Sequence, residues 1–293
     1  MKIRDGKPGK GIRFRGGMAG LFLILIAGTS CVHRQSVAQP EIESRSSSHT
    51  GIQLRVLTYN IRHGEGADGR VDLERTARVI RDAHADVVAL QEVDRGTSRV
   101  KGVDEAEELA RLTGLRMAFA CAIPFGGGQY GNAVLTRLEM IRPPQTISLP
   151  GEEKRALLWM DLKKTDGEGS PAGTFRFLAT HLDLNAGRRV ESVDEIENLF
   201  AGSSEMPALL AGDLNAEFPE TAFQNLLRHW GNTEKAGASA EPSCPADRPR
   251  ERIDHVLFRP ANRWRVIECR VLPEPEVSDH RPVLAVVELL PGK

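Results

Sequence analysis

The chain has 293 residues, 40% of them hydrophobic and 27% charged, and its net charge is −1 at pH 7. This composition is ordinary for a soluble globular protein. Residues 1–34 hold seven of the 39 Lys and Arg residues and one of the 40 Asp and Glu residues, so the rest of the chain carries a net charge of −7. That balance argues against a general nucleic-acid binder, which needs a basic surface, although it leaves room for a local basic groove.

The chain begins with a basic segment followed by the apolar run MAGLFLILIAG at 18–28, which is short for a bilayer span. A basic region before a short apolar stretch is typical of a secretory signal, and an uncleaved membrane anchor is the alternative. The next residues, GTSC at 28–31, resemble the lipobox of bacterial lipoproteins, although Gly28 stands where a Leu is usual. We therefore predict a signal peptide or lipoprotein signal over 1–31, and lipidation of Cys31 stays open. The domain is expected to be exported, either tethered to the outer or periplasmic side of a membrane or secreted.

Residues 32–51 are polar and rich in Ser, which predicts a flexible linker between the export segment and the folded domain. We find no internal repeat and no second linker, so 52–290 is predicted to be one domain. Within it, residues 231–250 are rich in Gly, Pro and Ala and predict a surface loop.

Hydrophobic periodicity predicts strands and helices that alternate along the domain. Strands are expected at 53–59, 86–91, 132–136, 156–162, 175–181, 207–213, 253–258 and 282–289. Helices are expected at 71–85, at 104–114, and near 187–200 and 219–228. Asp72 and Asp104 are the expected N-caps of the first two helices, and Glu107 would complete a capping box. Gly114 should end the second helix, and Pro219 should lie in the first turn of the last one. This pattern predicts an α/β fold in which helices cover sheets.

Polar residues recur where the predicted strands begin or end. They are Asn60, Glu92, His181, Asp213 with Asn215, Asp254, Asp279 and His280. Any one of them alone is more often a turn former or a satisfied polar group than a functional residue. Because the ends of neighbouring strands meet at one edge of a sheet, their recurrence predicts a single cluster there.

Seven motifs in chain order resemble those of the endonuclease/exonuclease/phosphatase superfamily of DNase I-like metal-dependent phosphoesterases. They are TYNI (58–61), QEVD (91–94), YGNAVLT (130–136), THLD (180–183), GDLN (212–215), RIDHV (252–256) and SDHRPV (278–283). The resemblance covers about residues 54–290. It implies a four-layer α/β sandwich, in which two packed, mainly antiparallel β-sheets are flanked by helices.

The resemblance also implies a metal site and a water-activating group. Glu92, with Asn60, would hold Mg²⁺ through oxygen ligands, with Mn²⁺ as the alternative, and Asp279 would complete the acidic shell. Asp213 would orient and deprotonate the attacking water, and Asn215 would donate to the oxygens of the transition state.

Further groups are expected to contact the phosphate. His280 would do so while oriented by Asp254. His181 would stabilise the phosphate or protonate the leaving group. The substrate-binding residues expected are Tyr130 and Asn132, with Arg155, in EKRALLW, as a further clamp on the anion. Arg281, next to the histidine of SDHRPV, is expected to be a solvated flank. Some nucleases of the family place an acid where this chain has Asn132, so the group that supports His181 is left open.

The function implied is an exported, metal-dependent hydrolase that cleaves a phosphoester substrate, with small phosphorylated molecules as the default. The alternatives are a secreted nuclease acting on DNA or RNA and a sphingomyelinase-like phospholipid phosphodiesterase. The charge of −7 and an aromatic content of 5% disfavour nucleic acid, which usually meets basic tracks and stacking platforms. A binding protein that has lost its catalysis is disfavoured because every expected metal and histidine residue is present. We expect a monomer, joined to a membrane only by its N-terminal lipid or anchor.

The cysteines do not indicate a disulfide framework. With Cys31 in the export segment, Cys121, Cys244 and Cys269 remain, an odd number without the spacing of a metal site. At most one disulfide fits, and Cys121 and Cys269 are expected to be small buried apolar residues.

Overall fold

The computed structural model describes residues 51–165, 172–202, 206–234 and 241–292. They belong to one compact unit, Ser48–Lys293, whereas the other unit, Met1–Ser47, lies outside the described residues. The predicted export segment and nearly all of the predicted linker therefore also lie outside them. Within the described part of the chain, every helix is too short or too polar to cross a membrane.

The first of two β-sheets has six strands in the spatial order β12–β13–β1–β2–β4–β3. Their bounds are β1 (Ile52–Asn60), β2 (Val87–Arg95), β3 (Arg116–Phe125), β4 (Gly128–Thr136), β12 (Trp264–Val271) and β13 (Val283–Leu289). Strands β1 and β2 run parallel, and all other neighbours in this sheet are antiparallel.

The second sheet has seven strands. Six lie in the order β10–β11–β9–β8–β7–β5, and β6 pairs with β7. Their bounds are β5 (Glu139–Met140), β6 (Gln145–Leu149), β7 (Arg155–Thr165), β8 (Ala172–His181), β9 (Ala208–Asp213), β10 (Gly231–Asn232) and β11 (Asp254–Arg259). Only β8 and β9 run parallel among these pairs. Both sheets are therefore mainly antiparallel, as predicted.

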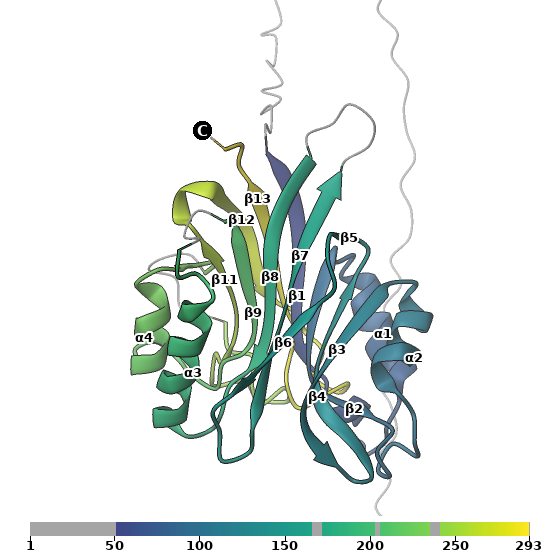
Figure 1. Cartoon of the computed structure of the whole chain (residues 1–293). Helices are drawn as coiled ribbons and strands as arrows, with labels where there is room; N and C mark the ends of the chain where they lie inside the picture. Colours follow the sequence, from purple (N-terminus) through teal and green to yellow (C-terminus); the bar gives the residue numbers. More distant parts are fainter. Residues whose placement is uncertain (1–50, 166–171, 203–205, 235–240, 293) are drawn as a thin grey trace, which may run out of the picture. The chain divides into compact units, whose positions relative to one another are not determined.

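The four α-helices of the described residues cover the outer faces of the sheets (Figure 1). They are α1 (Leu73–Asp82), α2 (Glu105–Thr113), α3 (Ala186–Asn198) and α4 (Thr221–Leu227). The Asp72 carboxylate accepts from two amides at the start of α1, and that of Asp104 accepts from the Glu107 amide. Gly114 ends α2 in the left-handed conformation, at φ +70°, as predicted from the sequence. The prediction for Pro219 was wrong: it precedes Glu220, the N-cap of α4, and so lies outside the helix.

Three apolar layers hold these elements together. Side chains such as Leu158, Phe175 and Phe177 fill the space between the two sheets. A second layer packs α1 and α2 against the first sheet, and a third packs α3 and α4 against the second sheet. The order helices, sheet, sheet, helices confirms the predicted four-layer α/β sandwich (Figure 1).

The cysteines of the described residues are free. Cys121, Cys244 and Cys269 form no disulfide, and each is half-buried. The expectation of full burial for Cys121 and Cys269 was therefore wrong. Cys121 is on β3, an edge strand of the first sheet, and Cys269 is on β12, the other edge strand, so each is covered from one side only.

Candidate active site

The strand register brings four polar residues to one edge of the sandwich. Asn60 ends β1, His181 ends β8, Asp213 ends β9 and Asp254 begins β11. His181 pairs with Asp213 across the parallel strands, and Asp254 pairs with Asp213 across the antiparallel ones. Because β1 belongs to the other sheet, the cluster joins the two sheets.

The Asp213 carboxylate is the meeting point of this cluster. Its Oδ2 accepts a hydrogen bond from Asn60 Nδ2 at 3.1 Å. The same oxygen lies 3.5 Å from His181 Nε2 and 3.8 Å from His280 Nε2. Its Oδ1 accepts from the Asn215 amide at 3.0 Å. One buried carboxylate thus contacts groups from β1, from β8 and from the segment before β13.

Protonation of Asp213 is made easier by its surroundings. Burial, and then the negative charge of Asp254, raise the pKa of Asp213 to about 7, although the charge of His280 opposes this shift. A carboxyl group with such a pKa can accept and release a proton near neutral pH, which suits a general base. This is the physical signature expected of a water-activating residue.

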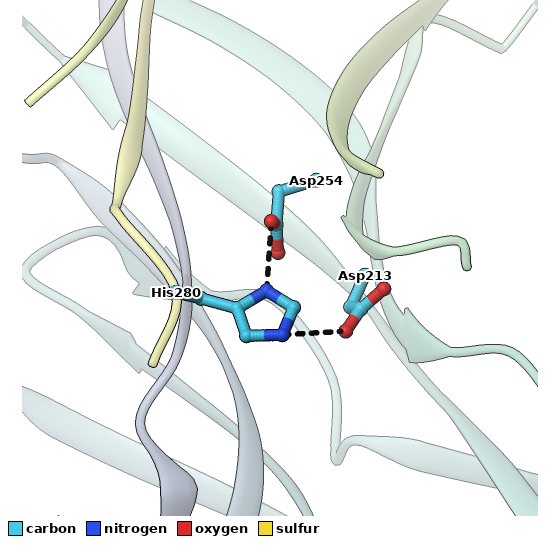
Figure 2. Close-up of side chains that lie close together, drawn as sticks. All are labelled: Asp213, Asp254 and His280. Carbon is cyan, nitrogen blue, oxygen red and sulfur yellow. Dashed lines mark hydrogen bonds and ion pairs between the residues drawn. The ribbon is translucent and has the colours of Figure 1, made fainter. Parts of the chain in front are cut away.

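His280 and Asp254 form a buried pair (Figure 2). His280 Nδ1 donates to Asp254 Oδ2 at 2.9 Å, and the Ser243 hydroxyl donates to the same oxygen at 2.6 Å. Burial opposes the charge of His280, but the charge of Asp254 and its hydrogen bond raise the pKa of His280. Burial likewise opposes the ionisation of Asp254, but the charge and hydrogen bond of His280 lower its pKa. The pair is therefore an imidazolium and a carboxylate, with the positive ring facing Asp213.

Glu92 is turned toward Asn60 by a local irregularity of β2. The register of β2 against β4 shifts between Leu90 and Val93, and Glu92 adopts φ +57°. Its Oε1 accepts from Asn60 Nδ2 at 3.0 Å. No Lys or Arg of the described residues forms an ion pair with this half-buried carboxylate, so its charge fits a bound cation. The Glu92 carboxylate is a hard oxygen donor of the kind that Mg²⁺ and Mn²⁺ prefer. Asn60 presents its amide nitrogen to Glu92 while its Oδ1 accepts from the Arg62 amide at 3.2 Å, so the Asn60 amide would have to turn to offer its oxygen to a metal.

Asp279 lies at the rim beside this pair. Its side chain is about half exposed, and its Oδ2 is 3.7 Å from Arg62 Nε. The Ser278 hydroxyl lies 2.8 Å from the Asn60 carbonyl oxygen and 3.3 Å from Asp279 Oδ1. Among the described residues, no hydrogen bond or ion pair joins Asp279 to Glu92. Its place in a metal shell stays a prediction.

A second group of possible ligands is better suited to holding protons. Oxygen and nitrogen atoms of Asp213, Asp254 and His280 lie within 4.8 Å of one another, close enough for a metal ion. Both ring nitrogens of His280 face carboxylates, however, and its pKa is raised. A protonated imidazole has no lone pair to offer a metal. Glu92 and Asn60 therefore stay the expected metal ligands, as a prediction from the sequence.

Arg155 and His181 lie at the same end of the neighbouring strands β7 and β8. Arg155 begins β7 and is buried, with Nη1 3.1 Å from Glu153 Oε1 and Nε 4.0 Å from Asp183 Oδ2. Burial, and then the positive charges of Arg155 and His280, hold the pKa of His181 well below its usual value. The imidazole of His181 is therefore neutral beside a guanidinium.

Tyr130 and Asn132 lie on β4. Burial and the neighbouring Glu92 carboxylate raise the pKa of the Tyr130 phenol, while Arg155 opposes the shift. The Tyr130 phenol thus lies close enough to both the Glu92 carboxylate and the Arg155 guanidinium to feel their charges. Asn132 Nδ2 donates to the Ala156 carbonyl oxygen at 2.8 Å, so one of its amide hydrogens ties β4 to β7.

Asn215 links the two loops that carry His181 and Asp213. It adopts φ +46°, and its Nδ2 donates to the Leu182 carbonyl oxygen at 2.9 Å. Since its backbone amide also donates to Asp213, the residue fixes the carboxylate and the β8 loop at once.

The segment 241–253 is more than the surface loop predicted from its composition. Ser243 in it is fully buried and bonds to Asp254. The Ala246 amide donates to the Asp279 carbonyl oxygen at 2.7 Å, and the Arg281 amide donates to the Ser243 carbonyl oxygen at 2.8 Å. The prediction of a solvated Arg281 was also wrong, because the residue is half-buried and its Nε donates to the Ala246 carbonyl oxygen at 2.7 Å. The loop therefore holds the strand-entry segment that carries His280.

Two contributors to the site were not singled out from the sequence. Ser278 stands inside the SDHRPV motif, so the motif itself could have pointed to it. Ser243 stands in a Gly-, Pro- and Ala-rich stretch, where a Ser gives no signal of its own.

Comparison with known proteins agrees with this geometry. The family described as Endonuclease/Exonuclease/phosphatase matches residues 57–280. The search of curated proteins finds no match. Similar solved structures include an endonuclease/exonuclease/phosphatase from Beutenbergia cavernae, with 27% identity, a TM-score of 0.66, and coverage of 81% of this chain and 72% of that one.

Two further structures have lower identity and show likeness of fold. One is a mannosyl-6-phosphatase from Bacteroides thetaiotaomicron, with 18% identity, a TM-score of 0.62, and coverage of 80% of this chain and 99% of that one. The other is the human Nocturnin catalytic domain with a bound sulfate anion, with 20% identity, a TM-score of 0.61, and coverage of 81% and 93%.

Proposed function

The chain belongs to the Endonuclease/Exonuclease/phosphatase family, whose members are phosphoesterase hydrolases, and we propose from this that it is a metal-dependent phosphoesterase with its active site at Asp213. The observation that carries the proposal is the convergence on one Asp213 oxygen of Asn60, His181 and His280, from both sheets. Such a buried acid, flanked by a fixed positive charge and a second acidic centre, suits hydrolysis of an anionic ester.

Glu92 and Asn60 are the proposed holders of the metal. Mg²⁺ or Mn²⁺ bound there would supply positive charge that neutralises the phosphate oxygens as the bond to the leaving group breaks. The Asn60 amide donates to both Glu92 and Asp213, so it fixes the metal-ligand carboxylate relative to the proposed base. Asp279, at the rim, is the proposed additional acidic ligand.

Asp213 is the proposed general base. Its pKa of about 7 lets it take a proton from an attacking water near neutral pH, and His280 stabilises the carboxylate form on one side. Because Asp254, itself held by the Ser243 hydroxyl, binds the His280 ring, the charge beside Asp213 stays in place through the reaction. Fixed charges of this kind cost no reorganisation when the transition state forms.

The remaining groups are proposed to bind the phosphate. Arg155 supplies a buried guanidinium, and Asn215 and Tyr130 supply neutral donors on either side. His181 is kept neutral by Arg155 and His280, so in the resting site it can donate one ring N–H; an incoming phosphate anion would raise its pKa and favour proton donation to the leaving group.

Small phosphorylated molecules are the proposed substrates. The mannosyl-6-phosphatase and the sulfate-bound Nocturnin domain support recognition of a tetrahedral anion in this fold. The net charge of −7 outside residues 1–34 supports a small substrate over a nucleic acid.

The test is hydrolysis by the purified protein of bis-p-nitrophenyl phosphate, inositol phosphates, a sphingomyelin analogue and plasmid DNA, each with Mg²⁺ and with EDTA. We expect turnover only with the metal. Glu92→Gln should raise the metal concentration needed and lower turnover, because a neutral amide binds the cation more weakly. Glu139→Gln, on the exposed strand β5, is the matched control and should behave like the wild type. Full activity in EDTA would refute the assignment.

We also propose that the protein is exported and tethered to a membrane or secreted, on the basis of the basic and apolar composition of residues 1–31. Cell fractionation should find the full chain with membranes and a chain starting at residue 52 in the soluble fraction. Cys31→Ser should release or misprocess the protein if Cys31 is lipidated, whereas unchanged retention would indicate an uncleaved anchor.

A further inference from the structure

Two large apolar side chains are more exposed than any others in the described part of the chain. Leu184 is 76% exposed and Phe218 is 67% exposed, whereas the next, Ile141, is 44% exposed. A single exposed apolar residue needs no explanation in a soluble protein. What distinguishes these two is their position, since each stands three residues after a residue of the candidate active site, His181 or Asn215.

Both loops keep these side chains outside the core. Leu182 and Leu214, earlier in the same loops, are buried in the layer under α3 and α4, so the loops already fill that layer. Three residues of chain span at most about 10 Å, so Leu184 and Phe218 start within that distance of the two site residues.

One buried arginine fixes the backbone at both positions. Arg189 Nη1 donates to the carbonyl oxygens of Asp183 and Leu184, at 3.1 and 2.6 Å. Its Nη2 donates to Glu220 Oε2 at 2.5 Å.

Glu220 in turn closes the turn that carries Phe218. Its Oε1 accepts from the Glu217 amide at 3.1 Å, and its own amide donates to the Glu217 carbonyl oxygen at 2.7 Å. Because Arg189 is only 6% exposed and joins this turn to the Leu184 carbonyl, the two loops are held together as one unit. These hydrogen bonds fix the backbone in the conformation that leaves the Leu184 and Phe218 side chains exposed.

We propose that Leu184 and Phe218 form an apolar contact for the non-phosphate part of the substrate, which therefore carries an alkyl or aryl group next to its phosphate. This rests on the proposed function, because the phosphate is what would bring the group to the two loops. A second protein is a poorer occupant, since a stable interface needs about 800 Å² from each partner and two side chains offer on the order of half of that.

The experiment measures binding of methyl-, butyl- and hexylphosphonate to the full chain by calorimetry in Mg²⁺. The phosphonate group tests binding at the phosphate site, and the alkyl chain tests the apolar contact. For the wild type, we expect the affinity to rise about two- to fourfold for each methylene group of the alkyl chain that becomes partly or fully buried on binding.

The double variant Leu184→Ser/Phe218→Ser should bind methylphosphonate like the wild type and lose the gain with chain length. Both side chains are exposed, so a thermal melt should show an unchanged fold. Ile141→Ser is the matched control. Ile141 follows β5, which pairs with the C-terminal end of β7, whereas Arg155 is at the N-terminal end of that strand. This variant should keep the dependence of affinity on chain length.

The outcomes separate this proposal from the proposed function. If the wild type fails to bind methylphosphonate, the phosphate site itself is misassigned, and both proposals fall. If methylphosphonate binds but longer chains bind no better, or if the gain persists in the double variant, only the apolar contact is overturned. Co-sedimentation with phosphatidylcholine vesicles that is lost in the double variant, together with a flat phosphonate series, would assign the two residues to a bilayer surface and also overturn it.

Discussion

The charge state of a few buried side chains decides how the candidate site can work. The sequence predicted Asp213 and His280 only as polar residues where strands end or begin. In the structure Asp213 is 1% exposed and His280 is 8% exposed, because the loop 241–253 and the second sheet enclose them. A buried charge that loses its partner is costly, so the two residues should respond differently to substitution.

Asp213→Asn should abolish most turnover and leave the fold intact. The amide keeps the shape of the carboxylate but cannot accept a proton from water, and general-base catalysis is worth roughly 10²–10⁴-fold in rate. Stability should be unchanged or higher, because the variant removes an ionisable group that burial makes costly to charge. The measurement is turnover of the best substrate alongside a thermal melt. Near-normal turnover would show that the base has been misplaced.

His280→Ala should lose turnover and also stability. Removing the imidazolium leaves the buried Asp254 carboxylate, among the described residues, with the Ser243 hydroxyl as its hydrogen-bond partner, and breaking one side of a buried ion pair costs about 3–5 kcal/mol. His280→Gln, which keeps a donor for Asp254, should recover part of the stability but little of the activity. The free energy of unfolding in urea and the rate for both variants check this; equal stability of wild type and His280→Ala would contradict the buried pair.

A free thiol gives a chemical test of the same centre. The Cys244 thiol lies close enough to the His280 ring to help raise the pKa of that ring, and the residue is half-buried. Alkylation with iodoacetamide should therefore inactivate the wild type, because the added group displaces the His280 ring. Cys244→Ala should remain active and resist the reagent, whereas Cys121→Ala should be inactivated like the wild type. Equal sensitivity of the two variants would place the reactive thiol elsewhere.

At the scale of elements, helices were easier to predict than edge strands. The N-caps Asp72 and Asp104 and the stop at Gly114 follow from local side-chain chemistry, which the sequence carries directly. Strands β3, β5, β6, β10 and β12 were missed. Edge strands are covered from one side, so their apolar pattern is weak, and register shifts in β3 and β12 break the alternation that would have revealed them.

The same distinction applies to the site. Asn60, His181, Asp213 and Asp254 could be placed together because strand ends in register share an edge. The approach of Glu92 to Asn60 depends on an irregularity of β2, and the burial of Ser243 depends on long-range packing of its loop. Neither leaves a local mark in the sequence.

Helix α2 is coupled to β2 through a buried carboxyl group. Glu105, in its first turn, accepts from the Asp94 amide at 2.7 Å, two residues beyond Glu92. Burial raises the pKa of Glu105 to about 8, against the effect of that hydrogen bond. The folded protein therefore binds more protons than the unfolded chain between the ordinary value of 4.5 and about 8, and stability should fall as pH rises through this window.

Glu105→Gln should remove most of that fall. The wild type should lose up to about 1.4 kcal/mol per pH unit within the window, while the variant, which cannot ionise, should not. The free energy of unfolding in urea at pH 5 and pH 8.5 tests this. Glu107→Gln, an exposed position on the same helix, is the control and should follow the wild type. Parallel pH curves for the wild type and Glu105→Gln would contradict the assignment.

At the scale of the whole molecule, the site exists only where the two sheets meet. Asn60, Glu92 and His280 belong to or adjoin strands of the first sheet, whereas His181, Asp213 and Asp254 belong to the second. The apolar layer between the sheets therefore sets the distance between the metal-ligand candidates and the base. A substitution that disrupts the packing of this layer should therefore also reduce activity. In a binding module built on one loop, the two effects would be independent.

The charge of the whole molecule predicts how it responds to salt. A protein that holds nucleic acid through 6–10 phosphate contacts loses about 10³–10⁵-fold in affinity between 50 and 200 mM salt. With a net charge of −7 outside residues 1–34, this protein lacks the overall positive charge for such contacts and should act on single phosphate groups. We therefore expect kcat/KM for a small phosphoester to change less than about threefold over that range, since only the groups around one phosphate are screened. Plasmid DNA should be hydrolysed poorly at every salt concentration. A steep loss of activity on DNA with added salt, from a high value at 50 mM, would instead reveal a basic track on the described surface and favour the nuclease alternative.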